Sequence, residues 1–281
     1  MSCHLCHSKN IKQRKGIVRD LPEVSILECD DCGLVFLSSF DHIHHGFYEN
    51  AFMRPDESME EWISETTLDD KRRFEFLRDA ILNKDVLDFG AGTGGFLRLA
   101  RTVAKKTVAV ELDKEAAALL ASQKVEHYYS IDEIPPDQKF DLITAFHVIE
   151  HLRDPIEFLQ NIAPRLSQSG RIYLEFPNAN DALLTMYESD SFSKFTYWGC
   201  HLMLFNHDTI RLAIEKAGLK CINVEQIQRY PLSNHMYWLA KNSPGGHNVW
   251  KFLADSNLER EYAKALAKAK ICDTLLVEVS L

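Results

Sequence analysis

The sequence of 281 residues predicts an α/β fold whose main part is a doubly wound, mostly parallel sheet of seven strands. Two observations carry this prediction. From Asp85 onward, short buried-strand runs alternate with runs of helical apolar spacing, and a glycine-rich turn joins the first strand to the first helix. Parallel strands need helix-length crossovers, so the alternation places helices on both faces of one sheet.

The individual elements follow from apolar runs and from chain breakers. We expect strands over 85–89, 107–112, 125–130, 140–146, 171–176, 220–228 and 274–281. We expect helices over 96–103, 114–123, 155–166, 233–241 and 258–270, and one from Asn206, an N-cap, to Gly218, a stop signal.

Three regions are expected along the chain. Residues 1–40 hold paired cysteines and short β-like runs, and they form a small module. Residues 41–84 form a helical lid or linker, because apolar residues repeat at helical spacing from Met59 to Leu82. Residues 85–281 form the main domain, with cap segments at 178–205 and 230–272. The alternation lapses for about 30 residues after Pro177, and breaks of that length are usually functional.

The composition excludes several classes of protein. Hydrophobic residues make up 46% of the chain and charged residues 26%, as in soluble globular proteins. No apolar run approaches the roughly 18 residues of a membrane span. No signal segment precedes Cys3, so a cytoplasmic location is expected, where the seven cysteines stay reduced. The net charge of −9 argues against general affinity for nucleic acid, although a basic stretch from Lys9 to Arg19 leaves a local patch open.

The strongest motif is the run from Asp85 to Phe96, Asp-Val-Leu-Asp-Phe-Gly-Ala-Gly-Thr-Gly-Gly-Phe. Its glycines let the backbone approach a ligand, and the following helix start offers unpaired N–H groups. Asp88 precedes the turn, where its carboxylate suits a cationic amino group and would repel a pyrophosphate. Glu111 ends the next strand, where a carboxylate accepts ribose hydroxyls.

Together these motifs resemble the first two motifs of class I S-adenosylmethionine-dependent methyltransferases, over roughly residues 70–230. The resemblance implies S-adenosylmethionine as cofactor, with its methionine part at Asp88 and the glycine turn and its ribose at Glu111. It also implies that the turn 130–132 flanks the adenine. The implied cofactor-binding residues are Asp88, Gly90, Gly92, Gly94, Glu111, Leu112, Ser130, Ile131, Asp132 and Phe146.

A second constellation, the run 146–155, follows the fourth strand. It resembles the H-V-x-E-H-x-x-D-P segment of methyltransferases that modify sugars, quinones and other small molecules. That resemblance implies that His147 faces the substrate, while Glu150 and His151 either take part in catalysis or orient the turn. The runs 175–178 and 201–205 resemble ketosugar C-methyltransferases, which carry two histidines where this chain has Gly199 and His201. The lost histidine favours O-methylation, with His147 or His201 as the base.

A rival interpretation uses the same residues. Glu150, His151 and His201 align with three of the four metal ligands of small-RNA 3′-end methyltransferases, and His147 replaces the first glutamate. A mixed nitrogen and oxygen set suits a first-row metal or zinc.

At the N-terminus, the pairs Cys3-x-x-Cys6 and Cys29-x-x-Cys32 have the spacing of a structural zinc ribbon. Four cysteines fill a tetrahedral site, so the nearby histidines His4, His7, His42, His44 and His45 are expected to be bystanders. Several sugar methyltransferases and a ribosomal-RNA methyltransferase group share such a module.

The sequence therefore predicts a methyltransferase that O-methylates a sugar, either a nucleotide sugar or a cell-surface glycan precursor, with no nucleic-acid partner. RNA methylation with the zinc module as reader is the first alternative. A catalytically inactive binding protein is the second. Tyr48 and Trp62 are candidates either for a lid over the cofactor or for core packing.

Overall fold

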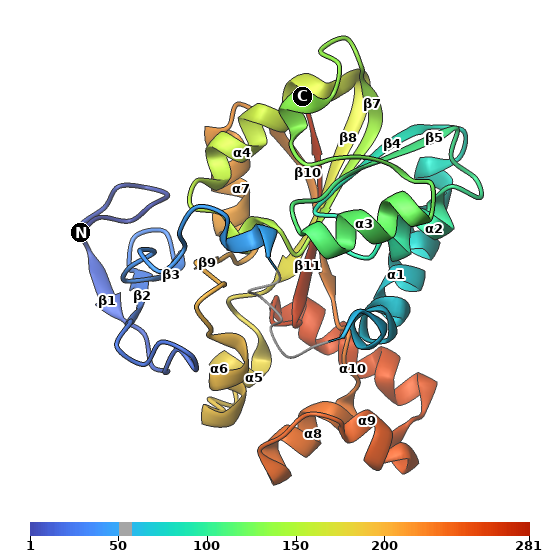
Figure 1. Ribbon diagram of the computed structural model, residues 1–281. Helices are drawn as coiled ribbons and strands as arrows, with labels where there is room; N and C mark the ends of the chain where they lie inside the picture. The colour runs from blue at the N-terminus through green and yellow to red at the C-terminus, as the bar shows by residue number, and fades with distance from the viewer. Residues whose placement is uncertain (51–57) are drawn as a thin grey trace.

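The structure, a computed structural model, describes residues 1–50 and 58–281 and centres on the expected seven-stranded sheet (Figure 1). The strand order is β10-β11-β8-β7-β4-β5-β6. The neighbours from β6 to β8 run parallel, and β11 runs antiparallel to β8 and β10. The strands are β4 (Asp85–Phe89), β5 (Lys106–Val110), β6 (Glu126–Tyr128), β7 (Phe140–Phe146), β8 (Leu166–Pro177), β10 (Lys220–Ile227) and β11 (Thr274–Ser280).

Helices cover both faces of this sheet, as the alternation predicts. One face packs against α1 (Met59–Ile81), α2 (Gly95–Ala100) and α3 (Lys114–Ser122), with Leu77, Phe96 and Leu120 in one core cluster. The other face packs against α4 (Pro155–Ile162) and α7 (His207–Lys216), with Phe158 and Ile210 in a second cluster. Figure 1 shows α4 and α7 on one side of the sheet and α1 and α2 on the other.

The strand order reverses at β4, which lies between β5 and β7. Ligands of open α/β sheets bind at such a reversal, outside the carboxyl ends of the strands. The glycine turn after β4, Glu111 after β5 and His147 after β7 therefore meet at one edge.

A second, smaller sheet has the order β1-β2-β3-β9. Three of its strands, β1 (Ile11–Gln13), β2 (Ile26–Cys29) and β3 (Val35–Leu37), belong to the cysteine module. The fourth, β9 (Met203–Leu204), comes from the long break after β8 and pairs with β3 through Val35 and Leu204. The sequence patterns indicated β2 and β3, in the β-like runs 25–29 and 34–37, but neither β1 nor β9. β1 has a single apolar residue and β9 has only two residues, so neither shows a period.

In the described part of the lid or linker region there is one long helix, where the sequence allowed one or two. α1 has 23 residues and begins with a capping box, in which Ser58 accepts from the Glu61 backbone and the Glu61 carboxylate accepts from the Ser58 backbone. A 3-10 turn, η1 (Phe47–Glu49), lies earlier in the region. Residues 51–57 of the predicted region lie outside the described residues.

The break after β8 and the C-terminal insertion contain more helix than expected. Short helices α5 (Ala182–Thr185) and α6 (Asp190–Thr196) lie in the break. α9 (Gly246–Val249) begins in the run Pro-Gly-Gly at 244–246, where the sequence predicts a break between two helices. The remaining elements are α8 (Leu232–Lys241), α10 (Ser256–Ala269) and the 3-10 turns η2 (Ile131–Glu133), η3 (Ile149–His151), η4 (Ala163–Arg165) and η5 (Lys251–Leu253). Among the described residues, no helix is long and apolar enough to cross a membrane.

Candidate active site

A cavity of about 520 Å³ opens at the carboxyl ends of β4, β5 and β7, a size that suits a small-molecule site. Two groups of side chains line it. The glycine turn, Asp88 and Glu111 line one part, and His147, His151 and His201 line the other. The fold thus brings together residues that are separated by more than a hundred positions in the sequence.

The glycine turn is shaped for a close approach of the backbone. Gly90 and Gly92 have φ of 70° and 52°, in the left-handed region that favours glycine. A Cβ atom at Gly92 would lie 2.9 Å from the Trp62 ring, so Trp62 packs directly over the turn and lines the cavity. Glu111 holds the turn from the other side, because its Oε2 accepts a 2.6 Å hydrogen bond from the Gly92 N–H.

Not all predicted cofactor-binding residues line the cavity. Leu112 and Phe146 do, whereas Gly94 lies against α3, where a Cβ atom would approach Leu120 Cδ2 to 2.5 Å. Gly94 therefore allows helix packing. The turn 130–132 is absent from the lining, and within the described chain the Ser130 hydroxyl caps η2 by accepting from the Asp132 N–H.

The two carboxylates of the cofactor part are buried. Burial raises the pKa of Asp88 to about 7, although a 2.6 Å hydrogen bond from the Thr144 hydroxyl acts in the opposite direction. Burial also raises the pKa of Glu111, against hydrogen bonds from the Asp113 and Gly92 N–H groups. A buried carboxylate of this kind gains most from a ligand that brings a positive charge or hydrogen-bond donors.

The backbone N–H and both ring nitrogens of His147 have polar partners. Its φ of 54° is unusual for a residue with a side chain, and its N–H donates a 2.7 Å hydrogen bond to the Glu175 carbonyl. The Nδ1 atom lies 3.1 Å from Glu150 Oε1, and Nε2 accepts from the Arg229 guanidinium at 3.1 Å. Both ring nitrogens are therefore engaged, which leaves neither of them to take a proton from a substrate.

Glu150, His151 and His201 form a compact cluster, in which one ligand atom from each lies within 4.8 Å of the others. The Nδ1–H of His151 donates to the Cys200 carbonyl at 2.7 Å, and that of His201 donates to the Thr196 carbonyl at 2.8 Å. These bonds fix the tautomer of each ring and leave its Nε2 as an acceptor. Glu150 Oε2 is buried without a hydrogen-bond partner in the described part of the chain.

The charge states in this cluster follow from burial and from close neighbours. Burial lowers the pKa of His201 to about 3, and it also lowers the pKa of His151. Burial alone would raise the pKa of Glu150, but the His147 hydrogen bond and the neighbouring imidazoles lower it to about 2. The cluster therefore holds one carboxylate and two neutral imidazoles near neutral pH.

An ionic network supports the cavity from α1. Glu175 on β8, which is fully buried, accepts hydrogen bonds from Arg72 and Arg73, and Asp69 accepts from Arg229. Asp69, Asp70, Arg73 and Arg229 also line the cavity, although no motif in the sequence marks them. The signal for the α1 residues was present, because Trp62, Thr66, Asp69, Asp70 and Arg73 follow helical spacing and share one face. Arg229 belongs to no motif or periodic pattern in the sequence, so its place in the cavity could not be predicted.

The aromatic candidates divide into lining and packing residues. Tyr48 lines the cavity and donates a 2.9 Å hydrogen bond from its hydroxyl to the His151 carbonyl. Trp198, from the long break, and Tyr230 also line the cavity. By contrast, Tyr237 and Trp250 contact each other edge to face, and Trp238 is buried against Phe192 and Phe195. Within the described residues 230–272, Tyr230 thus carries the contribution of that segment to the cavity lining.

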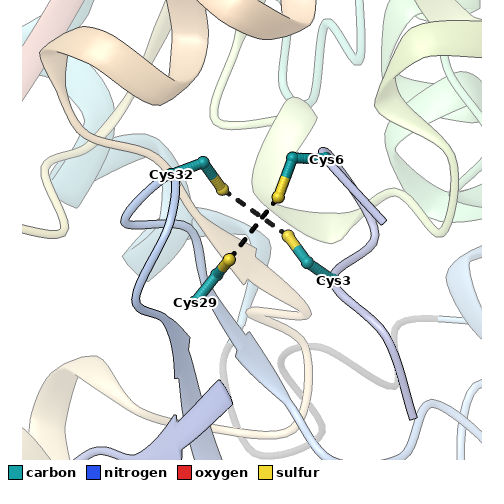
Figure 2. Close-up of side chains that lie close together, drawn as sticks. All are labelled: Cys3, Cys6, Cys29 and Cys32. Atoms are coloured by element: carbon teal, nitrogen blue, oxygen red, sulfur yellow. Dashed lines mark hydrogen bonds between the residues drawn. The ribbon is translucent and has the colours of Figure 1, made fainter. Parts of the chain in front are cut away.

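The four N-terminal cysteines converge on one point (Figure 2). The Sγ atoms of Cys3 and Cys32 lie 3.6 Å apart, and those of Cys6 and Cys29 lie 3.5 Å apart. Four thiolates around tetrahedral zinc would be separated by about 3.8 Å, given a Zn–S bond of about 2.3 Å. The arrangement fits a closed zinc site and leaves no open coordination position.

The basic stretch of this module is largely neutralised. Lys12 lies 2.7 Å from Asp30, Arg14 lies 3.4 Å from Glu28, and Lys15 lies 3.1 Å from Asp190. The Arg19 guanidinium stacks over the Trp198 ring at 4.7 Å from its centroid. Ion pairs thus balance three of the five basic side chains of the stretch, which reduces the positive charge available to a phosphate backbone.

The fold and the glycine turn define a Rossmann-like methyltransferase architecture, and comparison with known proteins agrees. A family model described as a methyltransferase domain matches residues 33–224, so the chain belongs to the methyltransferase domain family. The chain is 36% identical over 99 residues to a "Probable S-adenosylmethionine-dependent methyltransferase" of Mycobacterium tuberculosis, a match that covers 34% of this chain and 36% of the relative.

Other relatives differ in the acceptors that their names give. The chain is 28% identical over 176 residues to tocopherol O-methyltransferase of Arabidopsis thaliana, which covers 57% of this chain and 49% of that protein. It is 30% identical over 125 residues to a tRNA U34 carboxymethyltransferase of Colwellia psychrerythraea, which covers 41% of this chain and 38% of that protein. These matches span about a third to a half of the relatives' length.

Among solved structures, a SAM-dependent methyltransferase from Archaeoglobus fulgidus superimposes with a TM-score of 0.53 at 18% identity. The superposition covers 76% of this chain and 93% of that chain, and at this identity it supports the fold alone.

Proposed function

We propose that this chain transfers the methyl group of S-adenosylmethionine to a hydroxyl of a small-molecule acceptor, and that the acceptor is a sugar. One observation carries the proposal. The cavity joins a glycine turn between two buried carboxylates to the cluster of Glu150, His151 and His201. A donor held at the first part would therefore face an acceptor held at the second.

Each residue of the cofactor part has a proposed role. Asp88 binds the amino group of the cofactor, Glu111 accepts from the ribose hydroxyls, and Gly90 and Gly92 allow the backbone to approach. The cofactor supplies an electrophilic methyl group on its sulfonium. The protein holds the acceptor oxygen in line with that group, and such positioning removes much of the barrier to a bimolecular step.

His201 is the better of the two candidate bases. Its Nε2 has no hydrogen-bond partner among residues 1–50 and 58–281, and its Nδ1–H is fixed by the Thr196 carbonyl. His147, by contrast, contacts Glu150 and Arg229 through its two nitrogens and acts as a positioning residue. The low pKa of His201 makes it a weak base, because catalytic bases work best with a pKa near the operating pH.

That mismatch favours a second candidate, a divalent-metal-dependent O-methyltransferase. Glu150 and His151 are buried, His201 is partly buried, and one ligand atom from each lies close to the others. The two imidazoles are oriented by carbonyls at their Nδ1 atoms. Metal ligands must be deprotonated, and carbonyl partners of this kind are typical of metal-binding histidines. A divalent ion here would lower the pKa of a bound hydroxyl and so replace a strong base.

The sugar acceptor is supported by the rim of the cavity. Trp198, Tyr48 and Tyr230 supply flat apolar faces beside the polar cluster, a combination that suits a ring with several hydroxyls. The tocopherol relative acts on a phenol by its name, so phenols belong in the same test. RNA is a weaker candidate despite the tRNA-modifying relative, because the basic stretch of the module is paired with acidic and aromatic partners.

We further propose that residues 1–40 form a structural zinc module with Cys3, Cys6, Cys29 and Cys32 as ligands. The four-sulfur geometry supports this assignment, as does the reducing cytoplasm expected for a chain with seven free cysteines.

The function is tested with purified full-length protein and S-adenosylmethionine labelled in its methyl group. Nucleotide sugars, glycan precursors, phenols and single-stranded RNA are screened for label, with and without a chelator and added Mg²⁺, Mn²⁺ or Zn²⁺. Label on a sugar supports the proposal, and label on RNA or on no hydroxyl compound contradicts it. Activity that a chelator removes and one ion restores, while the N-terminal metal stays bound, selects the metal-dependent form.

A further inference from the structure

The segment 197–202, here called the acceptor segment, connects α6 to β9 and brings Trp198 and His201 to the cavity. Neither a helix nor a strand of the large sheet fixes its path. Its last residue is followed directly by β9, which belongs to the sheet of the cysteine module. Trp198 and His201 are therefore held from the module side of the cavity, whereas His147 and His151 follow β7 of the large sheet.

The cysteine module, together with His42 just after it, holds the main chain of the acceptor segment at Tyr197, Gly199 and Leu202. Main-chain and side-chain groups of residues 19–42 make four hydrogen bonds to it. These are Arg19 N–H to the Tyr197 carbonyl at 3.0 Å, the Gly199 N–H to Asp20 Oδ1 at 2.8 Å, His42 Nε2–H to the Gly199 carbonyl at 2.7 Å and Leu37 N–H to the Leu202 carbonyl at 3.0 Å.

Gly199 lies where these contacts are closest. A Cβ atom at this position would lie 2.7 Å from Leu21 Cδ1, 3.1 Å from Asp20 Oδ2 and 3.3 Å from His42 Nε2. The absence of a side chain lets the module approach the backbone on both sides of the peptide unit. A side chain at this position would have to displace Leu21 and Asp20, so glycine suits the close approach of the module better than the histidine that the ketosugar enzymes carry here.

The same contacts reach the catalytic side chains. The Arg19 guanidinium stacks over Trp198, and the Cys200 carbonyl accepts the hydrogen bond that fixes the His151 ring. The cofactor part has a different support, because Asp88 and Glu111 belong to β4 and to the end of β5 in the large sheet. A disturbance of the module should therefore act on one part of the cavity only.

We propose that Asp20 and His42 are positioning residues, through which the cysteine module sets the acceptor part of the active site without taking part in cofactor binding. Asp20 fixes the Gly199 N–H and His42 fixes the Gly199 carbonyl, and together they place Trp198 and His201. The acceptor role of this segment rests on the proposed function, whereas the division between the two parts of the cavity does not.

The test compares Asp20→Ala and His42→Ala with Asp20→Asn, which keeps an oxygen at Oδ1 for the Gly199 N–H. Two measurements need no acceptor: hydrogen exchange of the peptide covering 197–204, and calorimetric affinity for S-adenosylhomocysteine. We expect both alanine variants to exchange at least tenfold faster there while the dissociation constant changes less than twofold. Asp20→Asn should exchange nearly as the parent does.

A third measurement uses whichever acceptor the labelled-methyl screen identifies. Both alanine variants should lose turnover or acceptor affinity at an unchanged KM for S-adenosylmethionine, and Asp20→Asn should restore them. Unchanged hydrogen exchange in both alanine variants would overturn the inference. A loss of affinity for S-adenosylhomocysteine that accompanies faster exchange would also overturn it. Altered exchange with retained cofactor affinity supports it even if the sugar acceptor proves wrong, so the two failures are distinguishable.

Discussion

Burial favours the neutral form of single ionisable residues at this site. Asp88 and His201 have their pKa values moved in opposite directions, to about 7 and about 3, and each shift favours the neutral form. Residue identity and spacing made Asp88, Glu111 and His201 predictable. Arg229 was not, because it meets Asp69 and His147 only through folding and no local pattern marks it.

The shift at Asp88 predicts that cofactor binding is linked to a proton. Its raised pKa means that the free folded protein holds a proton that the unfolded chain has lost, so this group's contribution to stability falls as pH rises from about 4 to about 7. In the proposed binding mode, the amino group of the cofactor lies beside Asp88 and restores its charged form. At pH 6 we expect proton release on binding of S-adenosylhomocysteine, and affinity that rises up to about tenfold per pH unit toward pH 7.

Calorimetry in two buffers of different ionisation enthalpy measures that proton directly. Asp88→Asn should bind more weakly and release none. Equal heats in both buffers at pH 6 for the parent protein would contradict the assignment of Asp88.

Glu111 is predicted to stabilise the bound cofactor. Glu111→Ala removes an acceptor for the ribose hydroxyls and also the bond that holds the Gly92 N–H. We expect binding to weaken by about 1.5 to 3 kcal/mol, the range for hydrogen bonds to charged groups. Titration calorimetry decides, and an unchanged dissociation constant would mean that the ribose is held elsewhere.

His201 is predicted to act in turnover rather than in cofactor binding. His201→Ala should lower turnover by roughly a hundredfold or more, because it removes either the base or a ligand, and leave cofactor affinity nearly intact. His127→Ala, on β6 and outside the cavity lining, is the matched control and should behave as the parent does. Full activity of the His201 variant would reassign the proton to another group.

At the scale of elements, long segments with a clear apolar pattern were predictable. Short strands that pair with a segment distant in the sequence were not. The seven strands of the large sheet matched their predicted positions within a few residues, except that β8 starts earlier at Leu166 and β6 is shorter. Alternating apolar runs of five or more residues identify such strands. β9 has two residues, and its pairing with β3 depends on tertiary structure alone. The sequence therefore did not predict that the acceptor segment is held in place against residues 19–42.

The cysteine module is predicted to bind one zinc ion per chain. Metal analysis of purified protein should find it, and Cys29→Ser should lose it, because three thiolates hold zinc less well than four. Cys221→Ser, on β10 and distant from the cluster in sequence, serves as the matched control. Full zinc occupancy in the Cys29 variant would exclude these four cysteines as the ligand set.

The whole molecule carries a formal net charge of −9, and Lys12, Arg14 and Lys15 of its basic stretch form ion pairs. We therefore expect no measurable binding to single-stranded or structured RNA at physiological salt, since such binding depends on lysine and arginine displacing counterions. Fluorescence anisotropy at several salt concentrations measures it. Tight binding that weakens steeply with salt and disappears when residues 1–40 are deleted would favour the RNA-modifying alternative.

The pairing of β3 with β9 also sets an order of events during synthesis. All four cysteines leave the ribosome early, but the strand that completes their sheet follows roughly 170 residues later, about 10 to 30 s at ordinary translation rates. During that interval Val35 and Phe36 of the nascent module lack the strand that pairs with them, although both are buried in the folded protein. Metal capture would be the event that keeps it folded meanwhile. Arrested nascent chains ending before and after Leu204, probed by limited proteolysis with and without zinc, would reveal whether the early fragment survives only with metal.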